Sequence, residues 1–182
     1  SNTPFRLYKQ NQHEGGISSP LIAHWPNGLK TKPGSITRQP AHLIDFMATF
    51  LELGNAKYPR QAGNRVIEPL EGKSLVPIFK NAERKGHEAL YFHFGTDRAL
   101  RQGKWKLVSA KKGKWELYDM NKDRTELIDL AEKFPTKVET MKGIWFDIAK
   151  NKERLNQNGL SPVKGVIKEL SFRKDTSNQL NN

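Results

Sequence analysis

Cysteine is absent from this sequence of 182 residues. Disulfide bonds, thiolate nucleophiles and cysteine-ligated zinc are therefore excluded from the chain. Long apolar runs are also absent, because no stretch approaches the roughly 18 to 20 residues that a membrane-spanning helix needs. The N-terminus likewise lacks the apolar segment of a signal peptide. We therefore expect no membrane partner, although the lack of cysteine does not fix the cellular compartment.

Acidic residues are scarce relative to basic ones. Lysine and arginine number 31 against 19 aspartate and glutamate residues, which gives a net charge of +12. Such a charge attracts anionic partners, among them sulfated glycans, nucleic acid and acidic membranes. Because the basic residues are spread along the chain, a solvated basic surface explains them equally well. The apolar content of 36% is low, and it suits one compact domain with tails or a domain that lacks a partner surface.

Common metal and phosphate motifs are also missing. The stretch HEGG at His13 would need a second histidine at position 17 to form the helical zinc motif, and Ile17 stands there. The overlapping EGGISS has neither the spacing nor the lysine of a phosphate-binding P-loop, and no G-x-S-x-G esterase motif occurs. The histidines, which show no metal-ligand spacing, lie at positions 13, 24, 42, 87 and 93. We therefore expect no metal site within this chain.

Two main elements are predicted in the first half of the chain. The apolar run PLIAHWP, residues 20–26, ends in proline and predicts a buried strand that stops at a turn. In PAHLIDFMATFLELG, residues 40–54, apolar side chains recur at helical spacing from Leu43, with proline near the first turn and glycine past the end. This spacing predicts an amphipathic helix. Residues 55–73 favour irregular structure, and residues 72–81 allow one short helical turn.

From ALYFHF onward the apolar period changes to two. Four short runs, ALYFHF, RALRQG, KWKLVSA and KWELYDM, are rich in β-forming residues. Trp105 and Trp115 share the parity of the leucines two positions on, so we expect both indoles in the core and the neighbouring lysines in water. Alternating aromatic and basic residues would also suit a nucleic-acid-binding sheet, but the shared parity favours core packing and makes nucleic acid an unfavoured partner. Residues 111–113 would close the hairpin that pairs 104–109 with 114–119.

Two helices are predicted after these strands. Asp123 and Glu126 match a capping box that would open a short helix through residue 133. Pro135 is then placed to begin a second helix, whose apolar stripe consists of Val138, Met141, Trp145, Ile148 and Ala149. We expect this helix to lie across the antiparallel sheet with its tryptophan buried. The end of the chain is rich in Asn, Gln, Lys and Ser without a sustained period, which indicates a tail.

Two long segments resemble one protein family. SNTPFRLYKQNQHEGGISSPLIAHWP, residues 1–26, is similar to the latter part of the catalytic region of the arylsulfatases, the formylglycine-dependent sulfatases of the alkaline phosphatase superfamily. DRALRQGKWKLVSAKKGKWELYDMNKDRTELIDLAEKFP, residues 97–135, is similar to their C-terminal subdomain. The two segments lie in the family's order, with the family's helix and turns between them, so the resemblance covers roughly residues 1–149.

The resemblance implies an α/β fragment in three parts. Residues 1–86 would be the end of the sulfatase catalytic α/β domain. Residues 87–156 would form a small C-terminal subdomain in which a roughly four-stranded antiparallel sheet packs against a C-terminal helix, and residues 157–182 would be a polar tail. The missing N-terminal catalytic portion of the same protein would be a partner. We expect exposed apolar surface around residues 17–25 and 43–51, where that portion would dock.

The resemblance also implies a substrate site. In the family pattern K-x-x-x-x-E-G-G the lysine binds the sulfate of the substrate, which assigns sulfate binding to Lys9. His13, next to the following turn, could meet the substrate or could equally stabilise the turn. His93 lies in a stretch that approaches the pocket mouth in relatives, which makes it a candidate substrate contact. The implied substrate is a sulfated small molecule or a sulfated glycan.

The rest of the family's machinery does not match this chain. No serine stands in the C/S-x-P-x-R segment from which formylglycine is made, and the paired acidic residues that hold calcium are absent. The resemblance therefore implies that calcium and formylglycine belong to the parent enzyme outside this chain, and that the chain alone is inactive. The parent would hydrolyse aryl or carbohydrate sulfates in the periplasm or outside the cell. A phosphonate or phosphate ester hydrolase of the superfamily, and a non-catalytic basic module for sulfated glycan or nucleic acid, are the alternatives.

Overall fold

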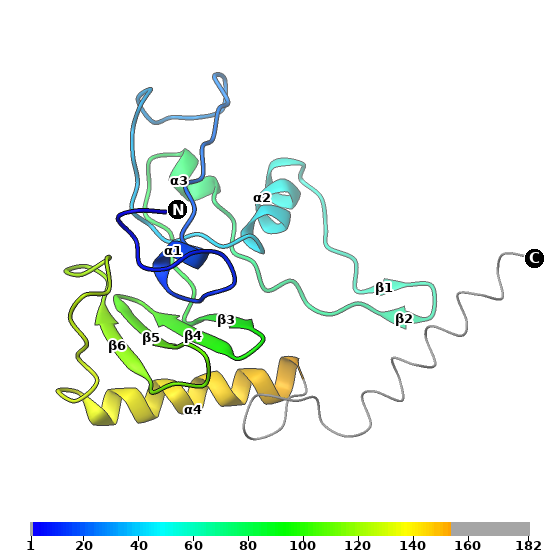
Figure 1. Ribbon diagram of the computed structural model, residues 1–182. Helices are drawn as coiled ribbons and strands as arrows, with labels where there is room; N and C mark the ends of the chain where they lie inside the picture. The colour runs from blue at the N-terminus through cyan, green and yellow to red at the C-terminus, as the bar shows by residue number, and fades with distance from the viewer. Residues whose placement is uncertain (1, 154–182) are drawn as a thin grey trace, which may run out of the picture. The chain divides into compact units, whose positions relative to one another are not determined.

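The computed structural model describes residues 2–153, and the predicted tail at 157–182 lies outside the described residues. The described chain forms two compact units (Figure 1). The first, which we call the sheet unit, combines residues 2–18 with residues 89–153. The second, which we call the α2 unit, comprises residues 19–88. The domain boundaries expected from the sequence stay a prediction about the longer protein.

The sheet unit is built on a four-stranded antiparallel sheet, as predicted. Its strands are neighbours in both sequence and space: β3 (Leu90–Phe94), β4 (Asp97–Gln102), β5 (Trp105–Ser109) and β6 (Glu116–Asp119). Leu107 lies opposite Leu100 on β4 and Leu117 on β6, so leucines of one parity meet across three strands. The β5–β6 turn reverses the chain with Lys111 and Lys112 at φ angles of 50° and 61°. The predicted pairing of the last two strands is confirmed.

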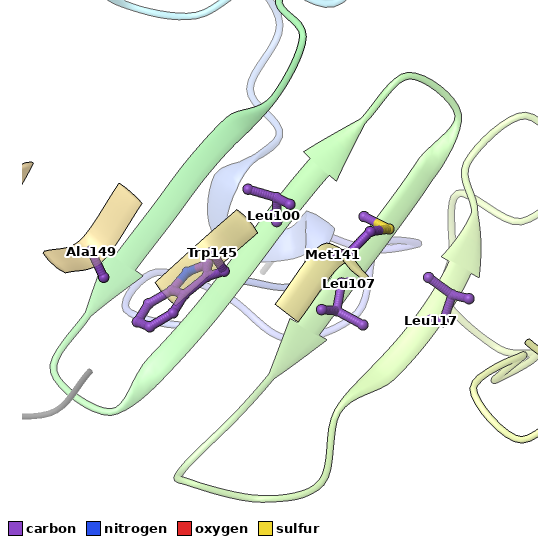
Figure 2. Packing of buried hydrophobic residues seen from close by; sticks show 6 residues of the cluster. All are labelled: Leu100, Leu107, Leu117, Met141, Trp145 and Ala149. Atoms are coloured by element: carbon purple, nitrogen blue, oxygen red, sulfur yellow. The ribbon is translucent and has the colours of Figure 1, made fainter. Parts of the chain in front are cut away.

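One face of this sheet is covered by α4 (Pro135–Lys152). The helix directs Met141, Trp145 and Ala149 at the sheet, at the spacing of one helical face, and all three are fully buried. They pack against the three leucines that meet across the strands (Figure 2). The Trp145 indole Nε1 also donates to the Phe92 carbonyl at 3.2 Å. The predicted helix across the sheet, with its tryptophan buried, is confirmed.

The opposite face of the sheet is buried too. Its apolar core consists of Ala99, Val108, Tyr118 and Met120, with Phe92 packed against them. Lys106 has the same parity and is 0% exposed, so the expectation that the lysines beside the tryptophans face water is wrong for Lys106. The Lys104 and Lys114 side chains are 46% and 75% exposed. The difference arises because Lys106 lies beneath α1 (Glu14–Ile17), a single helical turn near the N-terminus.

The segment after β6 does not form the short helix predicted from Asp123 and Glu126. Residues 120–134 are turns and irregular chain. The Asp123 carboxylate accepts from the backbone amides of Leu127 and Ile128, both at 2.8 Å, and so caps a wider loop than a helix N-terminus requires. Glu126 has a φ angle of 59°, which no helix residue adopts, and its side chain is directed to β5.

The α2 unit is organised around one buried carboxylate. Its elements are β1 (Gln61–Ala62) paired with β2 (Arg65–Val66), together with α2 (Asp45–Leu53) and α3 (Val76–Phe79). The Asp45 carboxylate is 0% exposed. It accepts hydrogen bonds of 2.6 to 2.9 Å from the backbone amides of His42 and Lys73 and from the side chains of Arg84 and His87. Burial alone would raise the pKa of Asp45, but these bonds hold it below its ordinary value.

Apolar side chains of the α2 unit remain exposed. The strand predicted at residues 20–26 is wrong, because this segment forms no strand and its Ile22 side chain is 88% exposed. The helix predicted next is confirmed as α2, but its apolar stripe points outward, with Met47 and Phe50 51% and 64% exposed. The inward side of α2 is polar instead, and Thr49 is 2% exposed. The apolar surface expected on both segments is therefore confirmed.

Candidate functional site

Lys9 lies in a tight loop near the N-terminus, residues 6–15, which we call the Lys9 loop. Leu7 and Gln10 within it have φ angles of 62° and 78°. The loop closes where the amide of its last residue donates to the carbonyl of its first, at 2.9 Å. The Lys9 side chain is exposed and makes no hydrogen bond or ion pair with the part of the chain that the structure describes. Its ammonium is thus available to an anion.

The glycine pair of the EGG motif leaves room for this loop. A Cβ atom at Gly15 would overlap the carbonyl oxygens of Arg6 and Leu7. A Cβ atom at Gly16 would overlap the carbonyl oxygen of Asn11. Only glycine lets the backbone of the loop pass this close to the start of α1. The lysine and the two glycines of the sequence pattern therefore belong to one compact structure.

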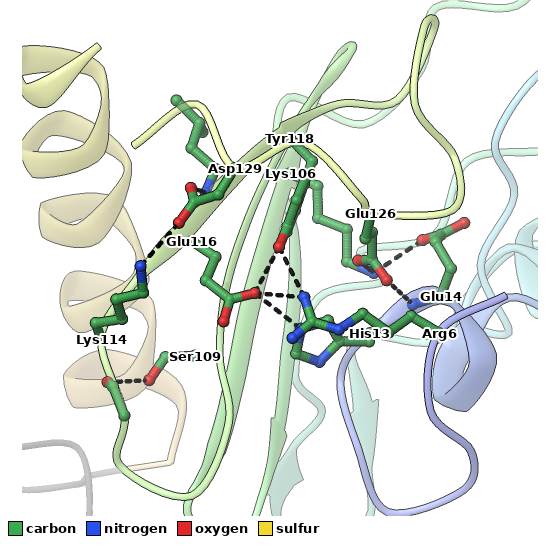
Figure 3. Close-up of polar contacts among 12 residues, drawn as sticks. Arg6, His13, Glu14, Lys106, Ser109, Lys114, Glu116, Tyr118, Glu126 and Asp129 are labelled. Atoms are coloured by element: carbon green, nitrogen blue, oxygen red, sulfur yellow. Dashed lines mark hydrogen bonds and ion pairs between the residues drawn. The ribbon is translucent and has the colours of Figure 1, made fainter. Parts of the chain in front are cut away.

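The start of the Lys9 loop is attached to β6. Arg6 Nη1 lies 2.7 Å from Glu116 Oε2 and 2.8 Å from the Tyr118 hydroxyl, which itself donates to Glu116 at 2.6 Å (Figure 3). Burial raises the pKa of Tyr118, and its bond to Glu116 raises it further, so the hydroxyl stays protonated. Burial alone would also raise the pKa of Glu116, but its hydrogen-bond donors hold that pKa below the ordinary value. This attachment is a charged hydrogen-bond network at the edge of the sheet.

The end of the Lys9 loop is attached to β5 by a buried cluster. Lys106 Nζ lies 2.9 Å from Glu14 Oε1 and 2.8 Å from Glu126 Oε1, and each of these side chains is at most 2% exposed (Figure 3). Glu126 also accepts from the Glu14 backbone amide at 2.8 Å. Arg124 Nη2 lies farther out, 3.5 Å from Glu14 Oε2. We call Lys106, Glu14, Glu126 and Arg124 the Lys106 cluster.

Opposite charges offset one another in the Lys106 cluster. Burial alone would raise the pKa of Glu14, but Lys106 together with two arginines outweighs burial and holds that pKa below the ordinary value. Glu14 is therefore ionised at neutral pH. Removing charged groups from water costs several kcal/mol for each ion, and only close pairing with additional hydrogen bonds offsets this cost.

His13 is buried beside the first attachment. Its side chain is 1% exposed and its Nε2 lies 3.3 Å from Glu116 Oε2. Burial lowers the pKa of His13, which favours the neutral imidazole. The sequence allows His13 either to contact the substrate or to stabilise the turn. Its burial against a carboxylate of β6 favours the second role. Substrate contact by His13 stays a prediction.

His93 lies apart from the Lys9 loop. It is on β3 and faces α4, where its ring meets the Trp145 ring edge-on at 5.5 Å between centroids. Its Nδ1 lies 2.7 Å from Glu153 Oε2 and its Nε2 lies 3.0 Å from the Gly95 carbonyl. The structure does not bring His93 together with Lys9, because the Lys9 loop is attached to the other face of the sheet. Substrate contact by His93 also stays a prediction.

The described residues do not supply the metal site that the family resemblance implies. Within residues 2–153, no group of three or more His, Asp or Glu side chains is arranged to hold a metal ion. The sequence also has no cysteine, and no serine within a C/S-x-P-x-R segment, from which formylglycine could be made. Calcium and formylglycine therefore find no matching residues in this part of the protein. None of the helices in residues 2–153 has the length and apolar character needed to cross a membrane.

The residues that hold the Lys9 loop were missed by sequence reasoning. Alternation along β5 shows that Lys106 and Trp105 face opposite sides of the sheet, but it does not show that both sides are covered. The sequence offers only a weak indication that Glu14 has a distant partner, because a glutamate in a glycine turn has no local one. Its partners are about a hundred residues away in the chain, and periodicity cannot identify contacts over such a separation.

Comparison with known proteins identifies a family that matches most of the described chain and relatives that match part of it. The family described as "N-sulphoglucosamine sulphohydrolase, C-terminal" matches residues 5–154. Steryl-sulfatase of Mus musculus is 38% identical over 111 residues, which cover 60% of this chain and 16% of that protein. N-acetylgalactosamine-6-sulfatase of Mus musculus is 31% identical over 106 residues, which cover 58% of this chain and 19% of that protein. The matched part is thus less than a fifth of the length of either relative.

Solved structures share the fold. The crystal structure of Ps i-CgsB has a TM-score of 0.61 at 22% identity, over 97% of this chain and 37% of that chain. A structure described under the metabolism of multiple glycosaminoglycans by Bacteroides thetaiotaomicron has a TM-score of 0.61 at 19% identity, over 79% of this chain and 32% of that chain. These likenesses concern the fold alone. The family match over residues 5–154 carries the assignment: the chain belongs to the family of N-sulphoglucosamine sulphohydrolase C-terminal regions, and so to the sulfatases.

Proposed function

We propose that this chain is the C-terminal portion of a sulfatase that hydrolyses sulfate esters of aryl or carbohydrate compounds. The observation that carries the proposal is the exposed Lys9 on a loop attached at both ends, inside a chain that belongs to a sulfatase family. A cation without a protein partner on a rigid support is suited to bind an anionic group of a substrate.

Lys9 would bind the sulfate through its ammonium group. Negative charge builds on the sulfuryl and bridging oxygens as the ester bond breaks, and a fixed cation stabilises this charge more strongly than it stabilises the ground state. Arg6 and Glu14 would act indirectly, by holding the two ends of the loop. We place the formylglycine nucleophile and the calcium ligands outside this chain, and no step here depends on them.

Sulfated glycans are the substrate class that we favour. Relatives of the chain include N-acetylgalactosamine-6-sulfatases and an ulvan-active sulfatase of Formosa agariphila. Ps i-CgsB, which shares the fold, has also been solved in complex with k-i-k-neocarrahexaose. The net charge of +12 would attract a polyanion. A polymeric substrate of this kind fits an enzyme of the periplasm or the cell exterior, which we propose as the location.

The test is substitution of Lys9 in the full-length protein. Lys9→Ala should lower kcat/KM for 4-nitrophenyl sulfate or a sulfated monosaccharide by about 10² to 10³, or about 3 to 4 kcal/mol. Both kcat and KM should change, because the ammonium contacts the sulfate in the ground and transition states. Lys9→Arg should recover only part of the loss, since a planar guanidinium does not replace a compact ammonium.

The melting temperature should stay close to that of the parent, because the Lys9 side chain is exposed and makes no hydrogen bond or ion pair within residues 2–153. Lys57→Ala, which removes another exposed lysine, is the matched control and should leave the kinetics unchanged. A kcat/KM for Lys9→Ala within about threefold of the parent would remove Lys9 from the site. Tight binding of heparin by the full-length protein, without turnover of any sulfate ester, would instead favour the non-catalytic basic module.

A further inference from the structure

We infer that Lys106 is a positioning residue for Lys9, acting through Glu14 and the Lys9 loop. This inference rests on the proposed sulfate-binding role of Lys9. Lys106 is on β5, far from Lys9 in the sequence, and its side chain is 0% exposed, so it meets no substrate itself. Its ammonium instead contacts Glu14, which is the first residue of α1 and lies near the end of the Lys9 loop.

The Lys9 loop has two points of attachment on neighbouring strands. Arg6 at its start is held by β6, through a side chain that is 39% exposed. Glu14 near its end is held by β5 through Lys106, and by the loop that follows β6 through the bond from its own amide to Glu126. The second attachment is the drier of the two, and charge pairs are stronger where water is excluded. It should therefore set the position of the loop more firmly.

Close packing transmits the position of Glu14 to the rest of the Lys9 loop. The glycines that follow Glu14 touch the carbonyls of Leu7 and Asn11, one on each side of Lys9, so closely that no Cβ would fit. A displacement of Glu14 moves these glycines, and the loop backbone must then move with them. Packed interiors have little free volume to absorb such a shift.

Stability alone does not account for a lysine in this position. An apolar residue on the same face would pack with Val108 and Tyr118, and buried ion pairs are often matched or exceeded in stability by well-packed apolar groups. What a buried ion pair adds is a directed contact with one particular partner. In the sheet unit that partner is Glu14. Glu14 belongs to the same loop as Lys9, the exposed cation of the family pattern.

The experiment is a double-mutant cycle in the full-length protein. Lys106→Met is made alone and in the Lys9→Ala background, with 4-nitrophenyl sulfate as substrate. Lys104→Met is the matched control, because Lys104 likewise forms an ion pair, with Asp119 of β6, but its side chain is 46% exposed and its partner is not in the Lys9 loop. Glu126→Gln is the milder second variant, which keeps side-chain size and an acceptor oxygen, and it decides the case if Lys106→Met does not fold.

Lys106→Met should lower kcat/KM by about 10- to 100-fold, since displacement of a catalytic group by about 1 Å can cost this much. Glu126→Gln should lower it by about 3- to 10-fold, and Lys104→Met should have no effect. In the Lys9→Ala background, neither Lys106→Met nor Glu126→Gln should cause a further loss, because there is no ammonium left to misplace. General destabilisation would instead multiply with the effect of Lys9→Ala.

Hydrogen exchange gives a readout that does not depend on activity. The amides of Glu14 and Gly15, which bond to Glu126 and Arg6, should exchange faster in Lys106→Met but not in Lys104→Met. Unchanged exchange, unchanged kcat/KM in the folded variants, or losses that multiply with Lys9→Ala would each overturn the inference. If Lys9→Ala itself keeps full activity, the proposed role of Lys9 is at fault, and the exchange data still report whether Lys106 holds the loop.

Discussion

Among single residues, His13 shows how the site controls charge through burial. The His13 side chain is 1% exposed, and burial lowers its pKa below the ordinary 6.5. Glu126 and Glu116 act in the opposite sense, but they do not restore the ordinary value. In the unfolded chain the same group titrates near its ordinary pKa of about 6.5. Between the two pKa values the unfolded chain binds more protons than the folded one, so the folded state loses stability as the pH falls.

We therefore expect His13 to make unfolding dependent on pH. The free energy of unfolding should fall below about pH 6.5, by about 1.4 kcal/mol for each unit by which the folded pKa is depressed, until the pH passes that folded pKa. His13→Gln cannot titrate and should lose this part of the dependence. Urea unfolding of both proteins between about pH 8 and pH 5 measures the difference. Profiles that stay parallel would show that His13 contributes nothing.

Lys9 and Lys106 show which features of the site can be predicted from the sequence. The sulfate-binding role of Lys9 is a prediction from a family pattern, in which a lysine precedes a glutamate and two glycines at a fixed spacing, and these residues are neighbours in the chain. Lys106 was expected in water because a strand pattern reveals only which side a residue faces. Whether that side is covered depends on a segment about ninety residues away, and no local rule contains this information.

At the scale of elements, α4 supplies the apolar side chains that bury one face of the four-stranded sheet. Its Trp145 is fully buried, meets the Tyr91 ring at 5.1 Å between centroids, and donates to the Phe92 carbonyl. A side chain of this size fills space that no neighbour can fill after truncation. We therefore expect the docking of α4 to depend strongly on this residue.

Trp145→Ala should accordingly lower the free energy of unfolding by about 3 to 5 kcal/mol. Ile128→Ala is the control in the same unit, because Ile128 is 64% exposed, and it should change stability by no more than about 0.5 kcal/mol. Denaturant unfolding followed by circular dichroism provides both values. A loss below about 1 kcal/mol for Trp145→Ala would mean that α4 contributes little to the core.

Elements with a strong period were predictable, and elements defined by polar contacts were not. The four strands and α4 follow from alternation and helical spacing, because apolar side chains there meet a real core. The helix expected from Asp123 failed, because its carboxylate satisfies the amides of a loop while Glu126 bonds to Lys106. The strand expected around Ile22 failed because that apolar run pairs with no other segment of residues 2–153.

At the scale of the whole molecule, apolar exposure is concentrated in the α2 unit. Ile22 and Ile36 are each 88% exposed, and Leu43 is 74% exposed. The outward stripe of α2 adds Met47 and Phe50. Exposed apolar surface of this kind marks an interaction site or a tendency to associate. The chain of 182 residues should therefore associate when it is prepared alone.

We expect this chain to bind an apolar dye such as ANS and to form oligomers detectable by light scattering. The double variant Met47→Lys with Phe50→Ser should lower the dye signal by roughly half and shift the mass towards the monomer. Leu127→Ser is the control, because Leu127 is 80% exposed but belongs to the sheet unit and not to the α2 unit, and it should change neither quantity much. A monodisperse parent monomer that binds no dye would contradict the prediction.

The two-segment origin of the sheet unit has a consequence for protein engineering. Residues 89–153 carry Lys106 and Glu116, whereas their partners Glu14 and Arg6 come from residues 2–18. A chimaera that took only the C-terminal segment from this protein would place a buried lysine against whatever N-terminal turn its host supplies. Recombination among sulfatases should therefore succeed only when both segments are exchanged together, even though residues 19–88 separate them in every gene of this layout.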